Sequence, residues 1–317
     1  GNSVVTDLGV EFRNFETLQG AGGDDTFTLS NGATIGRIDG QTGSDTINLT
    51  AYTSSRNVVL SGSATNGFNG TEAAVGTFAG ISTVNLNSGV SGNTLAGLNN
   101  DSVWALGAAP TYKTSSRVLN FSGAGAITGG SGKDIFNVAD NVTVDVNGGA
   151  GDDKLVVTDQ RVLTGDFNGG DGFDTVDLSA YMTSATFTIR DHGTAYVDTT
   201  TDSSASTLAN SVVGFLLEST GVTGNADNVE TVAGGSGTDQ ILGLNQQSAW
   251  SLSTVDDTLD QYFTQFSGEF IDPDPVTGGD ESFTFEFGRT LFATGIETRN
   301  GGSGIDTFTL QMDRLVA

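Results

Sequence analysis

Eight glycine-rich turns recur along the chain, and each is followed by alternating apolar and polar residues. The turns align on one acidic or amide residue, which is in successive units Asp25, Asp45, Asn93, Asp134, Asp153, Asp174, Asp239 and Asp306. The residue two positions later is apolar in every unit, and the residue four positions later is apolar except at Gly97 and Gly243. A period of two is that of a strand with one buried face. The pattern therefore predicts an all-β chain with a short strand after each turn.

The turns themselves share the sequence G-G-x-G-x-D. Five complete copies occupy residues 129–134, 148–153, 169–174, 234–239 and 301–306, and looser copies occupy 20–25, 40–45 and 88–93. Glycine adopts positive φ angles and lets neighbouring backbones approach closely. An aspartate can accept hydrogen bonds from the amides of its own turn. The motif is therefore suited to a sharp corner that recurs in a stack.

The spacing of adjacent turns predicts how the strands are arranged. Directly consecutive turns are 20, 19 and 21 residues apart (Asp25 to Asp45, Asp134 to Asp153, Asp153 to Asp174). A coil of about 20 residues holds two or three short strands and returns the chain to the same corner, which is a β-solenoid. We expect an apolar ladder inside it, formed by Phe27, Ile47, Phe136, Leu155, Val176 and Phe308.

A longer repeat is superimposed on the short one. NLTAYTS at 48–54 returns as DLSAYMT at 177–183, and GLNNDSVWAL at 97–106 returns as GLNQQSAWSL at 243–252. Differences between the two shifts place insertions at roughly 54–80, 190–220 and 254–290. We therefore expect residues 1–317 to be a single solenoid segment of a larger repetitive protein, with protruding loops at the insertions.

Composition removes several functional classes. The net charge is −26 with three lysines, so the clustered basic residues that neutralise nucleic-acid phosphates are missing. The chain has no cysteine and one histidine, His192, which excludes disulfides, thiol nucleophiles and histidine-rich metal sites. No apolar run reaches about 18 residues, so we expect no membrane span.

Several motifs together resemble a known family. These are F-E-T-L-x-G at 15–20, G-G-x-G-x-D followed by an alternating strand, D-L-S-A-Y at 177–181, and G-L-N-x-x-S-x-W leading to Trp104 and Trp250. In this combination the chain resembles the repetitive passenger regions of filamentous-haemagglutinin-like exoproteins, the adhesins of two-partner secretion. Biofilm-matrix adhesins regulated by cyclic di-GMP are similar.

The resemblance implies both a fold and a function. The expected fold is a right-handed parallel β-helix, and the expected function is that of a non-enzymatic stalk in cell adhesion and biofilm formation. Its partners would be exopolysaccharide or neighbouring cell-surface molecules, with an outer-membrane transporter during secretion. The implied location is the extracellular surface of a Gram-negative bacterium. No catalytic residue is carried over from the family.

A calcium-binding secreted repeat protein is the first alternative. The full turns match the calcium nonapeptide G-G-x-G-x-D-x-h-x, in which carboxylate and carbonyl oxygens of stacked turns hold Ca²⁺. Asp134, Asp153 and Asp174 are the candidate ligands, with Asp152 and Asp171 nearby. The competing interpretation is that these aspartates only cap glycine turns in solvent.

A polysaccharide-active enzyme is the second alternative, because two carboxylates suffice for glycoside hydrolysis. The acids fall at repeated positions and no pair stands out, so we expect no enzyme. Trp104 and Trp250 are expected to pack in the core rather than to stack on sugars, and His192 is expected at the surface. Residues 256–281 combine acids with aromatic residues, which predicts a solvated excursion or, alternatively, a sugar or cation site.

Overall fold

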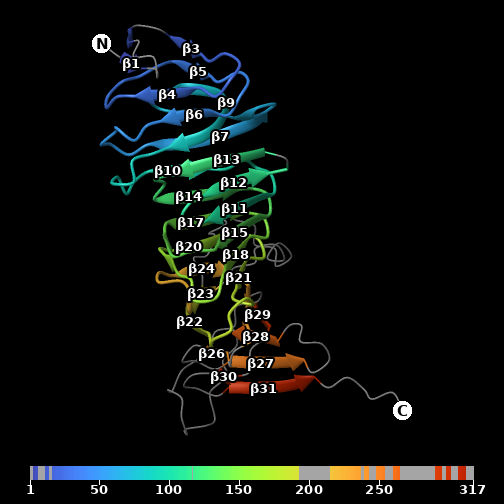
Figure 1. The fold of residues 1–317 in the computed structure, drawn as a ribbon. Coiled ribbons are helices and arrows are strands. Elements are labelled where there is room, and N and C mark those ends of the chain that lie inside the picture. Colours follow the sequence, from blue (N-terminus) through green and yellow to red (C-terminus); the bar gives the residue numbers. More distant parts are fainter. Residues whose placement is uncertain are drawn as a thin grey trace, which may run out of the picture. The chain divides into compact units, whose positions relative to one another are not determined.

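The chain is all-β wherever its structure is described. The computed structural model describes residues 3–5, 11–13, 16–115, 117–192, 215–236, 239–242, 248–253, 260–264, 290–294, 298–300 and 306–311. Within these ranges there is no helix, and consequently none that could cross a membrane. The chain divides into two compact units, residues 1–149 and residues 150–317, which are described separately (Figure 1).

The strands of the first unit are short, except in one hairpin region. They are β1 (Ser3–Val5), β2 (Glu11–Arg13), β3 (Thr17–Gln19), β4 (Thr26–Leu29), β5 (Arg37–Asp39), β6 (Asp45–Asn48), β7 (Asn57–Ala64), β8 (Gly67–Glu72), β9 (Gly76–Asn85), β10 (Thr94–Ala96), β11 (Ser102–Leu106), β12 (Thr111–Thr114), β13 (Arg117–Ser122), β14 (Ala126–Gly130), β15 (Asp134–Val138), β16 (Val142–Thr143) and β17 (Asp145–Ala150).

The second unit repeats this organisation. Its strands are β18 (Lys154–Val157), β19 (Leu163–Thr164), β20 (Phe167–Asp171), β21 (Thr175–Asp177), β22 (Thr186–His192), β23 (Phe215–Ser219), β24 (Ala226–Val229), β25 (Thr231–Ala233), β26 (Gln240–Leu242), β27 (Ser248–Ser253), β28 (Asp260–Thr264), β29 (Thr290–Thr294), β30 (Thr298–Asn300) and β31 (Asp306–Gln311).

Parallel pairing joins strands that are about one repeat apart or, where strands are inserted between them, further apart. In the first unit β3, β5 and β9 pair in parallel, and so do β4, β6 and β9 (Figure 1). Phe27 is the register partner of Ile47, which is in turn the partner of Val84. In the second unit β18, β21 and β25 pair in parallel, with Leu155, Val176 and Val232 in register. The pairing therefore places apolar side chains of successive strands in register, at equivalent positions for Phe27 and Ile47 and for Leu155 and Val176.

The predicted apolar ladder forms part of the core. Phe27, Ile47, Phe136, Leu155 and Val176 are all buried, whereas the side chain of Phe308 lies outside the described residues. The apolar residues seven positions before the aligned residue are also buried, from Leu18 and Ile38 to Phe167 and Val232. Burial of these rows is the main favourable contribution to folding of a chain with many polar residues.

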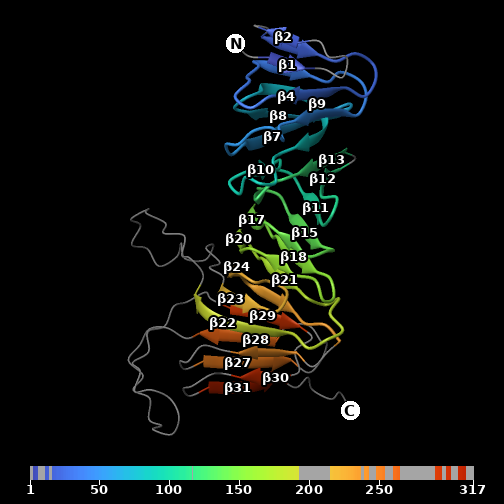
Figure 2. The ribbon, with the colours of Figure 1, turned by 60° about the vertical axis from the view of Figure 1, so that its left-hand side comes forward.

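Antiparallel hairpins interrupt the parallel stacking. In the first unit β7, β8 and β9 form an antiparallel meander, as do β11, β12 and β13. The second unit contains β22, β23 and β24, which lie side by side in Figure 2. Residues 54–80 were expected to protrude as a loop, but they contribute strands to the sheet, and Phe68 of β8 is fully buried. Much of 190–220 and 254–290 lies outside the described residues, although β23 and β28 fall within them.

The hairpins also change which turns and strands meet, so some turns do not lie against the equivalent turn of the next repeat. Asn93 precedes β10, which pairs with β7 and β14, and Leu95 therefore meets Val58 and Ile127 instead of the equivalent residue of another turn. Likewise Val176 meets Val232, which comes from the row before the turn. Inserted antiparallel strands take up positions in this mixed sheet and thereby change which of the later strands pair with one another.

The tryptophan motif builds an aromatic cluster. Trp104 is fully buried, and its ring centroid lies 4.6 Å from that of Tyr112 and 5.8 Å from that of Phe136. A side chain at Gly97 would lie within 3.0 Å of both Trp104 and Tyr112, which explains why the apolar pattern is interrupted there. Core packing of Trp104 is thus confirmed.

The second tryptophan has the same strand neighbours. Trp250 is in register with Tyr262 on an antiparallel strand and with Phe308 on a parallel strand, as Trp104 is with Tyr112 and Phe136. The side chain of Trp250 lies outside the described residues. The backbone register nevertheless shows that the longer sequence repeat corresponds to a structural repeat.

Candidate functional site

The aspartates of the glycine turns join one turn to the next. In the first unit the backbone N–H of Asp25 donates to Asp45 Oδ1 at 2.9 Å, and the N–H of Ala21 donates to Asp25 Oδ2 at 2.9 Å. One carboxylate oxygen can therefore close its own turn while the other holds the equivalent residue of the preceding turn. Such hydrogen bonds to a charged acceptor are shorter and stronger than neutral ones.

This geometry explains the glycines. A Cβ on Gly40, five residues before Asp45, would lie 2.4 Å from Asp45 Oδ2. Gly43 has a φ of 134°, and a Cβ there would lie 2.0 Å from the carbonyl oxygen of Gly23 in the preceding turn. Gly40 makes room for the carboxylate, and Gly43 permits both the positive φ and the close stacking.

The same kind of hydrogen bond between neighbouring turns recurs in the second unit, but there the row of acids continues from Asp174 to a glutamate. The N–H of Asp153 donates to Asp174 Oδ1 at 2.7 Å, and the N–H of Asp174 donates to Glu230 Oε2 at 2.6 Å. The expected neighbour relation of Asp153 and Asp174 is confirmed. Asp239 does not extend this row: it accepts the N–H of Ala185 at 2.6 Å and that of Gly235 at 2.7 Å. Sequence reasoning missed Glu230. Its signal in the sequence is the segment V-E-T-V-A-G at 229–234, which repeats F-E-T-L-Q-G at 15–20.

An outer row of aspartates accompanies the inner one. Asp24 Oδ1 accepts the N–H of Ser44 at 2.7 Å, Asp101 Oδ1 that of Lys133 at 3.0 Å, and Asp152 Oδ1 that of Phe173 at 3.3 Å. These three aspartates are exposed and come directly before the inner position. Each of these aspartates is followed by Asp or Ser at the inner position. Two consecutive side chains can therefore form hydrogen bonds at the same corner.

The inner row is buried, which corrects the expectation of solvated caps. Asp45, Asp134, Asp174 and Glu230 are 0 % exposed and Asp153 is 1 % exposed, whereas Asp25 is half-buried; Asp239, outside the row, is also 0 % exposed. Asp134 accepts a hydrogen bond from the hydroxyl of Ser102. The carboxylates point into the molecule because their oxygens accept hydrogen bonds from residues of neighbouring turns and strands.

Burial makes ionisation of these groups unfavourable. It raises the pKa of Asp134 to about 6, against the lowering effect of the Ser102 hydrogen bonds. It raises the pKa of Asp174 to about 7, with further increases from the charges of Asp152 and Asp171. The pKa of Glu230 is raised to about 9, first by burial and then by the charge of Asp174.

The calcium interpretation for Asp134, Asp153 and Asp174 stays a prediction. Within the described part of the chain, no three His, Cys, Asp or Glu side chains are grouped so that they could hold a metal ion. The carboxylate oxygens that the hydrogen bonds identify at these corners accept backbone or hydroxyl donors. Calcium binding there would compete with those donors.

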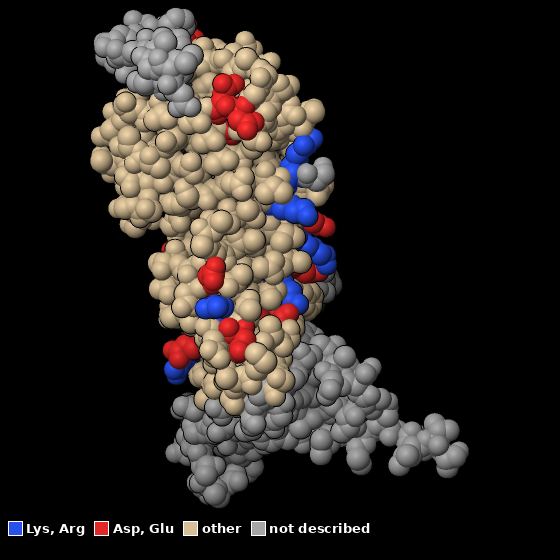
Figure 3. Space-filling model, in the orientation of Figure 1, with Lys and Arg blue, Asp and Glu red and all other residues tan. Residues whose placement is uncertain are grey.

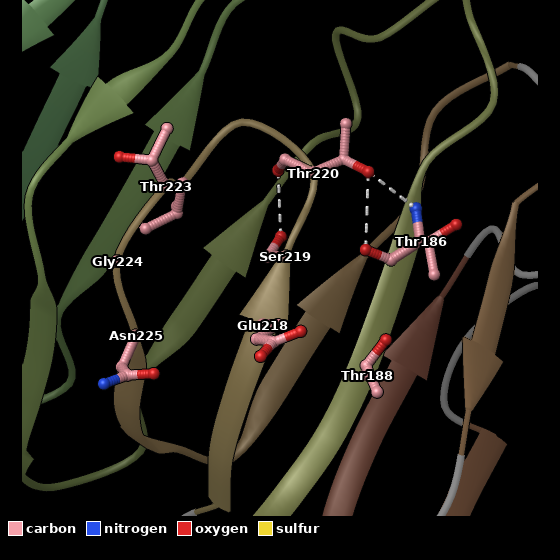
Figure 4. A pocket seen from close by; sticks show the side chains of 9 residues that line it. Thr186, Thr188, Glu218, Ser219, Thr220, Thr223, Gly224 and Asn225 are labelled. Carbon is pink, nitrogen blue, oxygen red and sulfur yellow. Dashed lines mark hydrogen bonds between the residues drawn. The ribbon is translucent and has the colours of Figure 1, made fainter.

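A polar groove also lies in the second unit, and its lining residue Thr186 directly follows Ala185, whose N–H donates to Asp239. It is a hollow of about 520 Å³ lined by Thr186, Thr188, Glu218, Ser219, Thr220, Val222, Thr223, Gly224 and Asn225. Figure 4 shows Thr186 and Thr188 of β22 on one side, Thr223 and Asn225 on the other, and Glu218 of β23 between them. The residues that form it come from two strands and a turn, and no motif in the sequence marks them.

Other candidates can be placed only in part. The backbone of His192 ends β22 opposite Phe215, but its side chain is not described. Of the acidic and aromatic segment 256–281, only 260–264 is described, as β28. The sugar or cation site suggested for that segment therefore lies largely outside the described residues.

Comparison with known proteins adds no identification. No protein-family profile matches the chain, and no curated protein was found to match its sequence.

Proposed function

We propose that the chain is a stalk segment of a secreted bacterial adhesin, wound as a right-handed parallel β-helix. The observation that carries this proposal is the recurrent use of acidic side chains to join successive turns. Asp45, Asp174, Glu230 and Asp239 each accept a backbone N–H from a residue 20 or more positions earlier. Because the repeated acidic side chains bind the protein's own backbone, they hold neighbouring segments together, which suits a mechanical role.

The tyrosines of the repeated A-Y motif have a similar role. The hydroxyl of Tyr181 donates to the carbonyl of Arg161 at 2.6 Å, and that of Tyr52 donates to the carbonyl of Ala33. Both tyrosines are buried, and both partners lie about one coil earlier in the sequence. Acid, tyrosine and glycine positions thus all support contacts between coils, which favours a stalk over an enzyme.

The surface supports the same proposal. Figure 3 shows a face on which uncharged side chains predominate and acidic and basic side chains form small separate groups. Such a face offers hydroxyl and amide groups for contacts with exopolysaccharide or with neighbouring cell-surface molecules. We place the protein at the surface of a Gram-negative bacterium, reached through an outer-membrane transporter.

Adhesion can be tested in the bacterium that produces the protein. The segment would be deleted in frame from its parent, and cell aggregation and biofilm mass would be measured together with the amount of protein on the surface. We expect aggregation to fall while surface display persists. Unchanged aggregation at equal display would overturn the adhesin proposal.

The fold is tested separately on the purified chain. We expect small-angle scattering to give an elongated particle with a cross-section that stays constant along its length. A compact particle would contradict the β-helix and would leave the result of the adhesion assay to be judged on its own.

A further inference from the structure

We propose that the polar groove of the second unit binds a neutral, hydroxyl-rich carbohydrate segment. The inference rests on the proposed function, because it names the ligand class that the adhesin would contact and the residues that would contact it. Three properties of the groove carry it: its walls are held in place, its unused side chains are hydroxyl and amide groups, and its charges disfavour anions.

One wall is held by the coil beneath it. The turn between β23 and β24 donates three backbone N–H groups to residues 163–166: Thr223 to the Leu163 carbonyl at 2.9 Å, Gly224 to the Gly165 carbonyl at 3.2 Å, and Asn225 to Asp166 Oδ1 at 2.8 Å. The backbone of this wall is therefore anchored while its side chains face outward. Preorganisation of this kind lowers the entropic cost of binding.

The other wall is tied to the same turn. Thr220 Oγ1 accepts the backbone N–H of Thr186 at 2.9 Å and donates to the Thr186 carbonyl at 3.4 Å, as Figure 4 shows. The hydroxyl of Ser219 donates to the Thr220 carbonyl at 2.9 Å. These bonds close one end of the groove and fix β22 against the turn.

The remaining side chains are suited to sugar hydroxyls. Thr188, Thr223 and Asn225 face the groove, and within the described residues their side chains take part in no hydrogen bond. A threonine hydroxyl and an asparagine amide each offer both a donor and an acceptor, as a sugar hydroxyl does. The threonine methyl groups and Val222 supply the limited apolar surface that the C–H groups of a sugar ring would contact.

Electrostatics selects among carbohydrates. Glu218 contributes a carboxylate to the groove, and Asp166 lies behind the anchored wall, hydrogen-bonded to Asn225. Arg190 forms an ion pair with Glu218, so its charge is compensated. No Lys or Arg is among the described residues that line the groove, so a uronate or phosphate group would find no free cation there and would face the carboxylate of Glu218. The expected ligand is therefore a neutral glycan and not an acidic one.

Binding can be measured on the intact purified chain by saturation-transfer NMR and calorimetry. The probes are neutral tetrasaccharides of glucose, galactose and mannose, with tetragalacturonate as the anionic comparison, each up to about 20 mM. We expect at least one neutral probe to bind, and tetragalacturonate to bind at least about tenfold more weakly.

Two substitutions test the location of the site. Thr188→Val keeps the shape of the side chain but removes the hydroxyl, and Asn225→Ala removes the amide; together they should weaken the bound neutral probe about fivefold or more. Thr28→Val, at a half-exposed threonine on β4, is the matched control and should leave binding unchanged. Equal thermal midpoints of all variants would show that each of them is folded.

The proposal is overturned if no neutral probe binds, if tetragalacturonate binds as well as the neutral probes, or if the double variant binds like the parent. If the adhesion assay failed while glycan binding persisted, the adhesin proposal would be refuted and the proposed glycan site would stand. The two proposals therefore fail by different measurements.

Discussion

Glu230 Oε2 accepts the backbone N–H of Asp174 at 2.6 Å, so two buried carboxyl groups lie side by side at the starts of two parallel strands, β21 and β25. Asp174 Oδ2 and Glu230 Oε1 have no hydrogen-bond partner among the residues that the structure describes, and the charges that act on the pair are those of other acids. Two ionised carboxylates in this position would repel each other across a medium of low polarity. The folded state therefore retains protons that the unfolded state would release.

The first prediction concerns pH. The pKa of Asp174 is raised to about 7 and that of Glu230 to about 9 in the folded protein, above their ordinary values of 3.8 and 4.5. A group whose acid form is favoured by folding stabilises the protein below its unfolded pKa, and this stability is lost as the pH rises toward the folded pKa. We expect the thermal midpoint to fall steadily between about pH 5 and pH 9.

A matched pair of variants tests the origin of that slope. Glu230→Gln keeps an oxygen for the Asp174 N–H but cannot ionise, so the midpoint should become less dependent on pH. Glu218→Gln removes an exposed carboxyl whose pKa is lowered by its hydrogen bond with Arg190, and it should leave the slope unchanged. If both variants retained the slope of the parent, the Asp174–Glu230 pair would not be its source.

The second prediction concerns the core. Phe136 is fully buried against Trp104, and replacing it by Asp would bury an unpaired charge and remove the ring contact. We expect Phe136→Asp to lower the free energy of unfolding by more than about 4 kcal/mol, or to prevent folding. The adjacent Ile135 is 37 % exposed, and Ile135→Asp should cost less than about 1 kcal/mol. Equal urea midpoints for the two variants would contradict the assignment of Phe136 to the core.

The third prediction concerns the glycine turns. Gly43→Ala forces a side chain into a φ of 134° and against the Gly23 carbonyl, so a loss of about 1–3 kcal/mol or more is expected. Gly62 on β7 has only the Asn69 Nδ2 atom within 4 Å of a built Cβ, at 3.9 Å. Gly62→Ala should therefore change the free energy of unfolding by no more than about 1 kcal/mol. Urea denaturation measures both, and a similar cost at the two positions would refute the stacking argument.

The fourth prediction concerns calcium at Asp134, Asp153 and Asp174. Because the identified carboxylate contacts are with amide and hydroxyl donors, we expect the same thermal midpoint in chelator, in millimolar Ca²⁺ and in millimolar Mg²⁺ at constant ionic strength. An ion that bound only the folded state would raise the midpoint as its concentration exceeded the dissociation constant. Mg²⁺ is the control because it requires a more regular oxygen cage than Ca²⁺. A rise specific to Ca²⁺ would establish the calcium alternative.

Local periodicity was sufficient to predict the strands that follow the turns and the buried rows that they contribute to the core. Phe27, Ile47, Leu155 and Val176 are buried because alternation along a strand places every second side chain on the same face, whatever lies beyond that strand. The glycines and the aspartate of each turn were also recognisable, since the steric conflict at Gly40 and the carboxylate of Asp45 lie within one six-residue segment. The sequence by itself thus determined the all-β class and the repeated corner.

Tertiary structure decided which turns meet and what surrounds them. In the first unit the strands β7, β8 and β9 change the neighbours of the turn at Asn93, and in the second unit Glu230 and not Asp239 lies beside Asp174. Burial of the carboxylates depends on the neighbouring turn and strands, which no single turn specifies. The groove joins residues of β22 to a turn anchored on residues 163–166, and a periodic pattern carries no information about such a meeting. Which distant segments meet depends on how every strand between them pairs in the sheet. That pairing is decided only in the folded molecule.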